Sequence, residues 1–201
     1  MTYYEEEENS FLKSIGQFFL DFIETIVIAL AIFVIVYKFL MQPHQVKGDS
    51  MFDNFHNGEY VLTSKITYKL NDPEVGDVVI FEAPKNEDYD YIKRIVGMPG
   101  DRVMIKKGKV YINSQLFDES GYLDTAVYTR TGRYFPEGEE IIVPNSSYFV
   151  IGDNRDHSSD SREWGFVPIE NIVGKAWVRY WPLNKMGVIK KYPKLTTSQE
   201  L

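Results

Sequence analysis

The first part of the chain carries one long apolar segment. Residues 22–41 include only two charged side chains, Glu24 and Lys38, and each lies near an end of the segment. A helix of about 20 residues can cross a bilayer, and charged side chains near its ends can reach the interface. We therefore expect a transmembrane anchor at 22–41. A buried core helix and a cleavable secretory signal are the alternatives, and the acidic region before the segment disfavours the second.

After the anchor the pattern changes to short runs of β-forming residues separated by Gly, Pro, Asn and Asp. No amphipathic helix of about 10 to 15 residues recurs between these runs, which disfavours a parallel α/β sheet. The pattern predicts a mainly β fold, an antiparallel β-sheet or barrel-like domain over 42–201. A hairpin turn is expected at 106–109, because Gly108 readily adopts a positive φ. The predicted strands are 59–66, 77–82, 89–96, 102–106, 109–113, 140–143, 148–151 and 174–181.

Two segments lie outside this core in the predicted organisation. Residues 1–21 are expected to form an acidic, solvated tail, because residues 5–8 are four successive glutamates. Residues 114–138 are polar and rich in turn-forming residues, which predicts a variable excursion from the β core. With 201 residues in all, the chain has room for one anchor and one folded domain.

Composition excludes several functional classes. A net charge of −7 and a pI near 5.1 argue against nucleic acid as a partner, because binding phosphates needs clustered Lys and Arg. The chain has no cysteine, so it has no disulfide framework, no thiolate nucleophile and no cysteine-based zinc site.

Ser50 and Lys93 are the residues that could carry chemistry. Ser50 follows the anchor by a few residues, in Gly48-Asp49-Ser50-Met51, where a surface turn is the alternative explanation. Lys93 lies in an apolar run, and strand alternation puts it on the same face as Tyr91 and Ile95. Burial of that face lowers the pKa of the lysine, as a general base requires. An edge-strand lysine that extends its amine into solvent is the alternative.

The loop 152–162 is dense in hydrogen-bonding groups and directly follows an apolar run. It could place a hydroxyl beside a neutral amine and hold it with Asp–Arg pairs, or it could be a solvated turn. A calcium loop built from Asp153, Asp156 and Asp160 is disfavoured, because the spacing does not match an EF-hand. A Ser-His-Asp triad with His44, His56 or His157 is a further alternative, but none of these histidines has a recognisable catalytic context.

Taken together, four blocks resemble the type I signal peptidase family, the membrane-anchored Ser/Lys endopeptidases that remove signal peptides from exported proteins. The resemblance implies that Ser50 is the nucleophile, Lys93 the general base, and Ser158 the hydroxyl that orients the lysine amine. It also implies two structural ion pairs near the site, Arg94 with Asp153 and Asp160 with Arg162. The blocks are 48–51, 76–81, 91–101 and 152–165.

The chain departs from the resemblance at the oxyanion hole. Some members have a serine two positions before the nucleophile, where this chain has Gly48. The Ser50 backbone N–H remains as one donor, and a lost second donor could cost about 3 kcal/mol.

The resemblance further implies a peptidase without metal or cofactor, whose partners are preprotein signal peptides and the lipid bilayer. The expected substrates have small residues at the first and third positions before the cut, because alternate side chains of an extended peptide point the same way. The candidate pocket walls are Val46, Met51, Ile80, Tyr91 and Ile92. Phe52, Trp177 and Trp181 are candidates for contact with the membrane, although each could equally be core. Nothing in the sequence indicates an oligomeric state.

The size and single anchor look like the short form common in Gram-positive bacteria, in which the catalytic domain is extracytoplasmic. The positive-inside rule points the other way, since Lys13 precedes the anchor while Lys38 and Lys47 follow its centre. We give the resemblance more weight, because long domains are translocated largely regardless of such charges.

Two other functions were considered. A self-cleaving Ser/Lys peptidase, like the repressors of the SOS response, shares the dyad but has a DNA-binding domain and no anchor. A catalytically inactive signal-peptidase-like chaperone for surface pilins would not need both Ser50 and Lys93.

Overall fold

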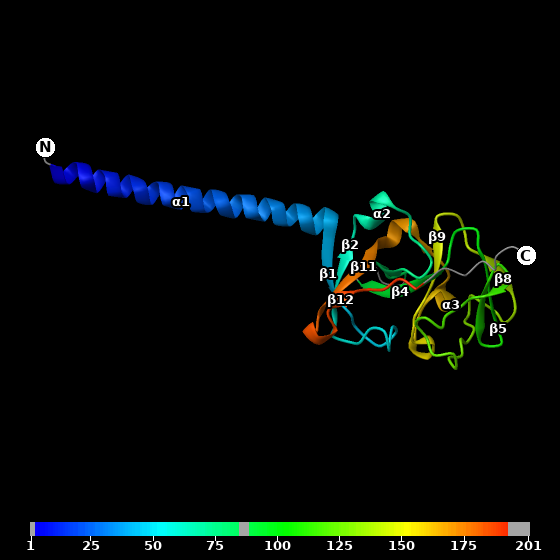
Figure 1. Ribbon diagram of the computed structural model, residues 1–201. Helices are drawn as coiled ribbons and strands as arrows, with labels where there is room; N and C mark the ends of the chain where they lie inside the picture. Colours follow the sequence, from blue (N-terminus) through cyan, green and yellow to red (C-terminus); the bar gives the residue numbers. More distant parts are fainter. Residues whose placement is uncertain (1–2, 85–88, 193–201) are drawn as a thin grey trace, which may run out of the picture. The chain divides into compact units, whose positions relative to one another are not determined.

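A computed structural model describes residues 3–84 and 89–192, which divide into two compact units, Met1–Leu40 and Met41–Leu201. The first unit is helical and the second is built mainly of antiparallel strands (Figure 1).

The N-terminal unit is one long helix. Helix α1 runs over Tyr3–Ile35 and continues as the π-helix η1 at Val36–Leu40. The stretch Ile15–Leu40 is long and apolar enough to span a membrane, and its most apolar part is not buried in the structure. The expected anchor 22–41 falls within this stretch except for Met41, which begins a strand. Helix α1 also includes most of the expected acidic tail, although the side chains of residues 5–8 lie outside the described part.

The larger sheet of the second unit contains the strands that carry the candidate dyad. Its strand order is β1-β2-β11-β3-β4-β9-β10, with β12 added beside β11, and every neighbouring pair is antiparallel. The strands are β1 (Met41–Gln45), β2 (Tyr60–Ser64), β3 (Val78–Glu82), β4 (Asp90–Gly97), β9 (Ser147–Ile151), β10 (Val167–Pro168), β11 (Ile172–Trp181) and β12 (Gly187–Val188).

A smaller sheet of four strands has the order β7-β6-β5-β8, also antiparallel throughout. Strands β5 and β6 pair up to Lys106 and Lys109, so their turn has two residues, Lys107 and Gly108, both with positive φ. This is the hairpin turn expected from the sequence, and a two-residue turn of this kind matches the twist of the flanking strands. The strands are β5 (Arg102–Lys106), β6 (Lys109–Ile112), β7 (Gln115–Leu116) and β8 (Glu140–Ile142).

Short helical turns connect the strands. They are α2 (Thr67–Leu70), η2 (Arg155–His157), α3 (Ser161–Trp164), η3 (Ile169–Asn171) and η4 (Leu183–Lys185). Turn η2 and helix α3 lie in the polar loop that follows β9, so this loop has defined structure.

The core is divided into three hydrophobic clusters, and β4 contributes to all of them. Ile92 packs in one with Val46 and Met51, Ile95 packs in a second with Val79 and Phe81, and Val96 belongs to the third. Both faces of β4 are therefore buried, which explains its long apolar run. The third cluster also includes Phe117, Tyr122 and Phe135. The segment 114–138 thus contributes large side chains to the core despite its polar composition.

The mainly β fold class predicted from the sequence is confirmed. Each predicted strand overlaps an observed one, but β1, β7, β10 and β12 were not expected. The sequence does not predict β1 because the strand contains Pro43, which has no backbone N–H to donate to a neighbouring strand. It is tolerated here because β1 lies at the edge of the sheet and pairs only with β2.

Candidate active site

Ser50 lies in the turn region between β1 and β2, and Lys93 of β4 contacts it. The Lys93 Nζ atom lies 2.8 Å from Ser50 Oγ and 2.9 Å from the Ile92 carbonyl oxygen, to which it donates. Both side chains open onto a cavity of about 640 Å³. The sequence placed these residues 43 positions apart, and the fold brings them into hydrogen-bond contact.

Lys93 is a buried lysine, with 3% of its surface exposed. Burial lowers its pKa from 10.5 to about 8, although the carboxylates of Asp160 and Asp153 act in the opposite direction. Its amine lies 5.2 Å from the centre of the Tyr91 ring, consistent with the shared strand face expected from alternation. The alternative of a solvent-exposed edge lysine is therefore wrong.

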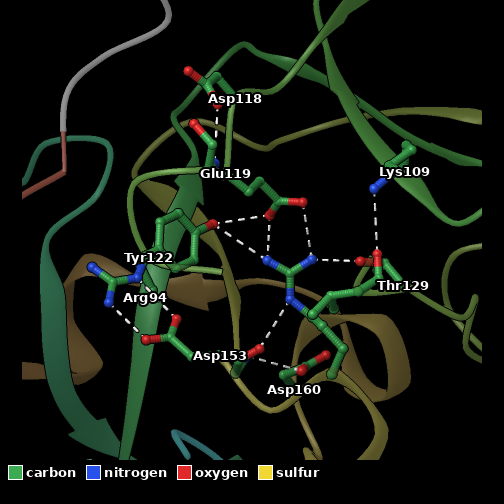
Figure 2. Close-up of polar contacts among 12 residues, drawn as sticks. Arg94, Lys109, Asp118, Glu119, Tyr122, Thr129, Asp153 and Asp160 are labelled. Atoms are coloured by element: carbon green, nitrogen blue, oxygen red, sulfur yellow. Dashed lines mark hydrogen bonds and ion pairs between the residues drawn. The ribbon is translucent and has the colours of Figure 1, made fainter. Parts of the chain in front are cut away.

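Arg94, the next residue of β4, forms the ion pair expected with Asp153. Its Nε and NH2 atoms donate to the two carboxylate oxygens of Asp153 at 2.9 and 2.7 Å, and its NH1 donates to the Gly76 carbonyl. The guanidinium carbon also lies 4.2 Å from the centre of the Tyr122 ring, and Figure 2 shows Arg94 next to Asp153. Asn54 donates a further hydrogen bond to Asp153. The pair is fully buried and joins β4 to the loop after β9.

Asp160 and Arg162 form the second expected pair, with Nε donating at 2.8 Å. Asp160 also accepts from the Gly152 backbone N–H at 3.0 Å and caps helix α3 through the Arg162 N–H. The Asp160 carboxylate thus connects the far part of the loop 152–162 to its first residue, Gly152. Gly152 has no room for a side chain, since a Cβ there would lie 2.1 Å from Ser158 Oγ and 2.5 Å from the Ser50 carbonyl oxygen.

Ser158 lies beside the dyad, but its hydroxyl does not contact the lysine. Its Oγ is buried and has no hydrogen-bond partner within the described residues. The only acceptors recorded for the Lys93 amine in that part of the chain are Ser50 and Ile92.

The backbone N–H groups around Ser50 are the candidate donors of the oxyanion hole. The Ser50 carbonyl accepts from the Asn154 N–H at 3.0 Å, whereas the Ser50 N–H has no acceptor among residues 3–84 and 89–192. The Gly48 N–H donates to the Asn57 side chain at 3.0 Å, and Gly48 has a φ of +79°. Gly48 therefore offers no second donor in this arrangement, and its conformation favours glycine.

Four of the five candidate pocket residues line the cavity that holds the dyad. They are Val46, Ile80, Tyr91 and Ile92. Met51 is not part of the lining; it is buried in the cluster behind them, and its sulfur accepts from the Asp153 N–H at 3.4 Å. The cavity is bordered by β1 and by residues 90–93 of β4. Among the described residues each has an open edge, because β1 pairs with β2 alone and β9 joins β4 only from Arg94 onward.

The alternative chemistries lack the required contacts. His44 contacts Asp90 and Thr63, His56 contacts Glu59 and Lys185, and within the described chain no imidazole is hydrogen-bonded to Ser50. The acidic residues weighed as calcium ligands are paired with arginines: Asp153 with Arg94, Asp160 with Arg162, and Asp156 with Arg130 at 3.4 Å.

Sequence patterns do not indicate the buried ion pair between Arg155 and Glu119. Arg155 donates to the carboxylate of Glu119, to the Thr129 hydroxyl and, at 3.0 Å, to the Gly152 carbonyl. Tyr122 Oη donates to Glu119 at 2.9 Å (Figure 2). No local pattern links Glu119 to Arg155, which lies 36 positions away.

Phe52, Trp177 and Trp181 are all exposed, at 45%, 41% and 51%. They are not core residues, and they remain available for the membrane contact expected from the sequence.

A buried lysine amine in contact with a serine hydroxyl is the arrangement of a serine hydrolase with an amine as its base. The chain belongs to the signal peptidase family, peptidase S26, whose model matches residues 19–181. It is accordingly a serine endopeptidase by family.

Curated relatives agree with this assignment. The chain is 37% identical over 177 residues to signal peptidase IB of Staphylococcus aureus, covering 83% of this chain and 91% of the relative. It is 35% identical over 171 residues to a probable signal peptidase I-2 of Synechocystis, covering 83% and 75%. A crystal structure of a signal peptidase I from Enterococcus faecalis matches at 27% identity with a TM-score of 0.43, covering 52% of this chain and 97% of that one.

Proposed function

We propose that this chain removes signal peptides from exported preproteins, with Ser50 as nucleophile and Lys93 as general base. The observation that carries the proposal is the 2.8 Å contact between Lys93 Nζ and Ser50 Oγ, made by a lysine that is 3% exposed. A lysine with a pKa of about 8 is neutral in roughly 10% of molecules at pH 7, against about 0.03% for an ordinary lysine. Burial therefore supplies the neutral amine that a serine nucleophile needs.

The mechanism follows from this contact. The neutral amine takes the Ser50 proton as Oγ attacks the scissile carbonyl carbon, and the resulting ammonium then protonates the leaving amine. Water then attacks the acyl carbon of the acyl-enzyme and gives a proton to Lys93. As the ester bond to Ser50 Oγ breaks and the carboxyl product leaves, Lys93 returns that proton to Oγ, which restores the hydroxyl and the neutral amine. We assign the Ser50 N–H as one oxyanion donor, because it points to no other acceptor in the described residues.

The Ser158 hydroxyl is available to support this role of Lys93. Its buried Oγ lacks a partner within residues 3–84 and 89–192, and a buried hydroxyl left unpaired is unfavourable. We propose that it accepts from the ammonium when Ser50 has lost its proton to Lys93 and the amine turns away from Oγ. The Arg94–Asp153 pair joins β4 to the loop after β9, and the Asp160–Arg162 pair holds the loop itself.

The substrate is proposed to bind as an added strand between the open edges of β1 and β4. Main-chain hydrogen bonds along these edges would hold an extended peptide without reading its sequence. Val46, Ile80, Tyr91 and Ile92 fill the cavity wall with large side chains, which leaves room for small residues at the first and third positions before the cut.

The anchor is proposed to keep the dyad at the membrane surface. Ser50 follows the candidate span by ten positions, a length that reaches at most about 33 to 36 Å when fully extended. Signal-peptide cleavage sites emerge at that level on the outer face of the cytoplasmic membrane, which is where we place the catalytic domain.

The test is cleavage of a preprotein by the purified, detergent-solubilised full chain, with the cut located by mass spectrometry. We expect one cut after a small-x-small site, and a loss of at least about 1000-fold in rate for Ser50→Ala and for Lys93→Met. Matched controls are Ser120→Ala and Lys106→Met, which change exposed residues of the same two types.

Each outcome separates the alternatives. Cleavage lost only in the dyad variants supports the proposal. Full turnover in either dyad variant removes that residue from the mechanism. No cleavage of several preproteins by the unaltered chain, with specific binding retained, would favour the chaperone function instead.

A further inference from the structure

The loop after β9 supports the serine directly. Asn154 donates its backbone N–H to the Ser50 carbonyl at 3.0 Å and its side-chain amide to the Asp49 carbonyl at 3.0 Å. Gly152, two positions earlier, has no spare space against the same Ser50 carbonyl. A movement of residues 152–155 therefore cannot be absorbed locally and changes the position of Ser50.

Arg155 holds this turn through the Gly152 carbonyl. Its Nε donates to the Gly152 carbonyl at 3.0 Å, and its side chain is 1% exposed. The guanidinium is held by the carboxylate of Glu119, together with Thr129 and Tyr122, as Figure 2 shows. All three partners belong to the segment 114–138. This segment, which appears in the sequence as an excursion, is thus connected to the nucleophile through Arg155 and residues 152–154.

Glu119 also balances the buried positive charge of Arg155. Glu119 gives the largest favourable charge interaction with the buried Arg155, and Asp153 gives a weaker one. Asp153 is already bound by both Arg94 nitrogens, and it is also one of the two carboxylates that favour the charged form of Lys93. Arg162, a cation that lowers the Lys93 pKa, is paired with Asp160. Without Glu119, Asp153 is the remaining carboxylate that acts on both Arg155 and Lys93.

We propose that Glu119 is a positioning residue for the peptidase reaction: by anchoring and neutralising Arg155, it holds residues 152–155 against Ser50 and preserves the charge balance around Lys93. This inference rests on the proposed function for its effect on turnover. It assigns a catalytic consequence to a residue of the 114–138 segment, far from the dyad in the sequence.

The first test replaces Glu119 by Gln and compares it with Asp118→Asn. The control removes the same charge from the adjacent residue, which is exposed and not bonded to Arg155. We expect Glu119→Gln to lower kcat by about 10-fold to 100-fold, the range that a small misplacement of a catalytic group produces, with KM little changed. Asp118→Asn should keep both constants. Equal constants in Glu119→Gln and the unaltered chain would overturn the proposal.

A second readout separates positioning from a general loss of structure. The Lys93 amine is titrated by NMR with lysine labelled at Cε, its signal being identified by its absence in Lys93→Met. An uncompensated Arg155 charge should move the Lys93 midpoint to lower pH in Glu119→Gln, whereas Asp118→Asn should not move it. A midpoint that stays in place in folded Glu119→Gln contradicts the charge argument.

The double variant Glu119→Gln/Arg155→Met covers the case in which Glu119→Gln alone does not fold. Removing both partners leaves no unpaired buried charge, and such replacements are often neutral for stability. The Lys93 midpoint should return to that of the unaltered chain, while kcat stays low because the turn has lost its anchor. Full activity of the double variant would overturn the positioning role. Because the titration needs no turnover, it still tests this inference if the unaltered chain cleaves no preprotein.

Discussion

At the scale of single residues, the candidate chemistry depends on the cost of burying one amine. Lys93 lies in the middle of a strand that is buried on both faces, and burial is the largest influence on its pKa. A lysine there is unfavourable for folding and favourable for base catalysis. Such conflicts between stability and local environment are expected at functional sites.

The first prediction concerns the pH dependence of cleavage. Because the reaction needs neutral Lys93 in the free enzyme, kcat/KM should rise with pH and reach half of its plateau near pH 8. Below that midpoint the increase should be about tenfold per pH unit. The measurement is kcat/KM for a preprotein between pH 6 and pH 10. A profile that is flat over this whole range would rule out Lys93 as the titrating base.

The second prediction concerns the stability of Lys93→Met. The folded-state pKa of about 8 lies below the unfolded value of 10.5, so the unfolded chain binds more protons between these values. The penalty for burying the amine is therefore complete below pH 8 and is relieved as pH rises toward 10.5. Removing it should stabilise the inactive variant by up to about 3 kcal/mol at pH 7, and by less than half of that at pH 10.

Urea unfolding of the full chain in detergent, at both pH values, measures this difference. Lys106→Met, at an exposed position, serves as the control and should show little change at either pH. A Lys93→Met variant that is less stable than the unaltered chain at pH 7 would mean that the amine is stabilising where it lies.

At the scale of elements, the sequence pattern located most of the strands, and the two residues it predicted as a dyad, Ser50 and Lys93, lie in contact. The alternation in 91–95 was sufficient to place Lys93 on a face with Tyr91 and Ile95. It was not sufficient for β1, where Pro43 and polar neighbours hide a strand that exists because β2 pairs with it. Contacts such as Glu119 with Arg155 depend on tertiary structure alone, since neither residue stands in a distinctive local pattern.

Strand β11 provides a prediction about the sheet that carries the site. It pairs with both β2 and β3, and a Cβ at Gly174 would lie 2.4 Å from the Ser64 carbonyl oxygen. Backbone atoms on a paired strand cannot move aside, so Gly174→Ala should destabilise the domain by about 1 to 3 kcal/mol. Gly187→Ala, in β12, meets nothing within 4 Å and should change stability by less than about 0.5 kcal/mol.

Urea unfolding of the two glycine variants, monitored by tryptophan fluorescence, measures this difference in stability. Equal midpoints would mean that β11 can shift away from β2 without loss, and the close approach at Gly174 would then have no structural importance.

At the scale of the whole molecule, charge and proposed function disagree about orientation. The few lysines near the candidate span favour a cytoplasmic second unit, because Lys38 and Lys47 follow its centre while Lys13 precedes it. The proposed substrate requires the opposite, since a cleavage site becomes accessible only after translocation. We expect the second unit to be extracytoplasmic, because three lysines are a weak signal for a domain of this length.

The absence of cysteine makes this orientation directly measurable. Glu139→Cys introduces a single thiol at an exposed position of the second unit, and a cysteine in place of Lys13 marks the other side of the span. In intact protoplasts, a membrane-impermeant maleimide should label Glu139→Cys and leave Lys13→Cys unlabelled until the cells are lysed. The reverse pattern would place Ser50 and Lys93 in the cytoplasm, where they could not meet a translocated preprotein. The proposal that this chain removes signal peptides at the outer face would then be wrong, even if Ser50 and Lys93 still catalysed peptide hydrolysis.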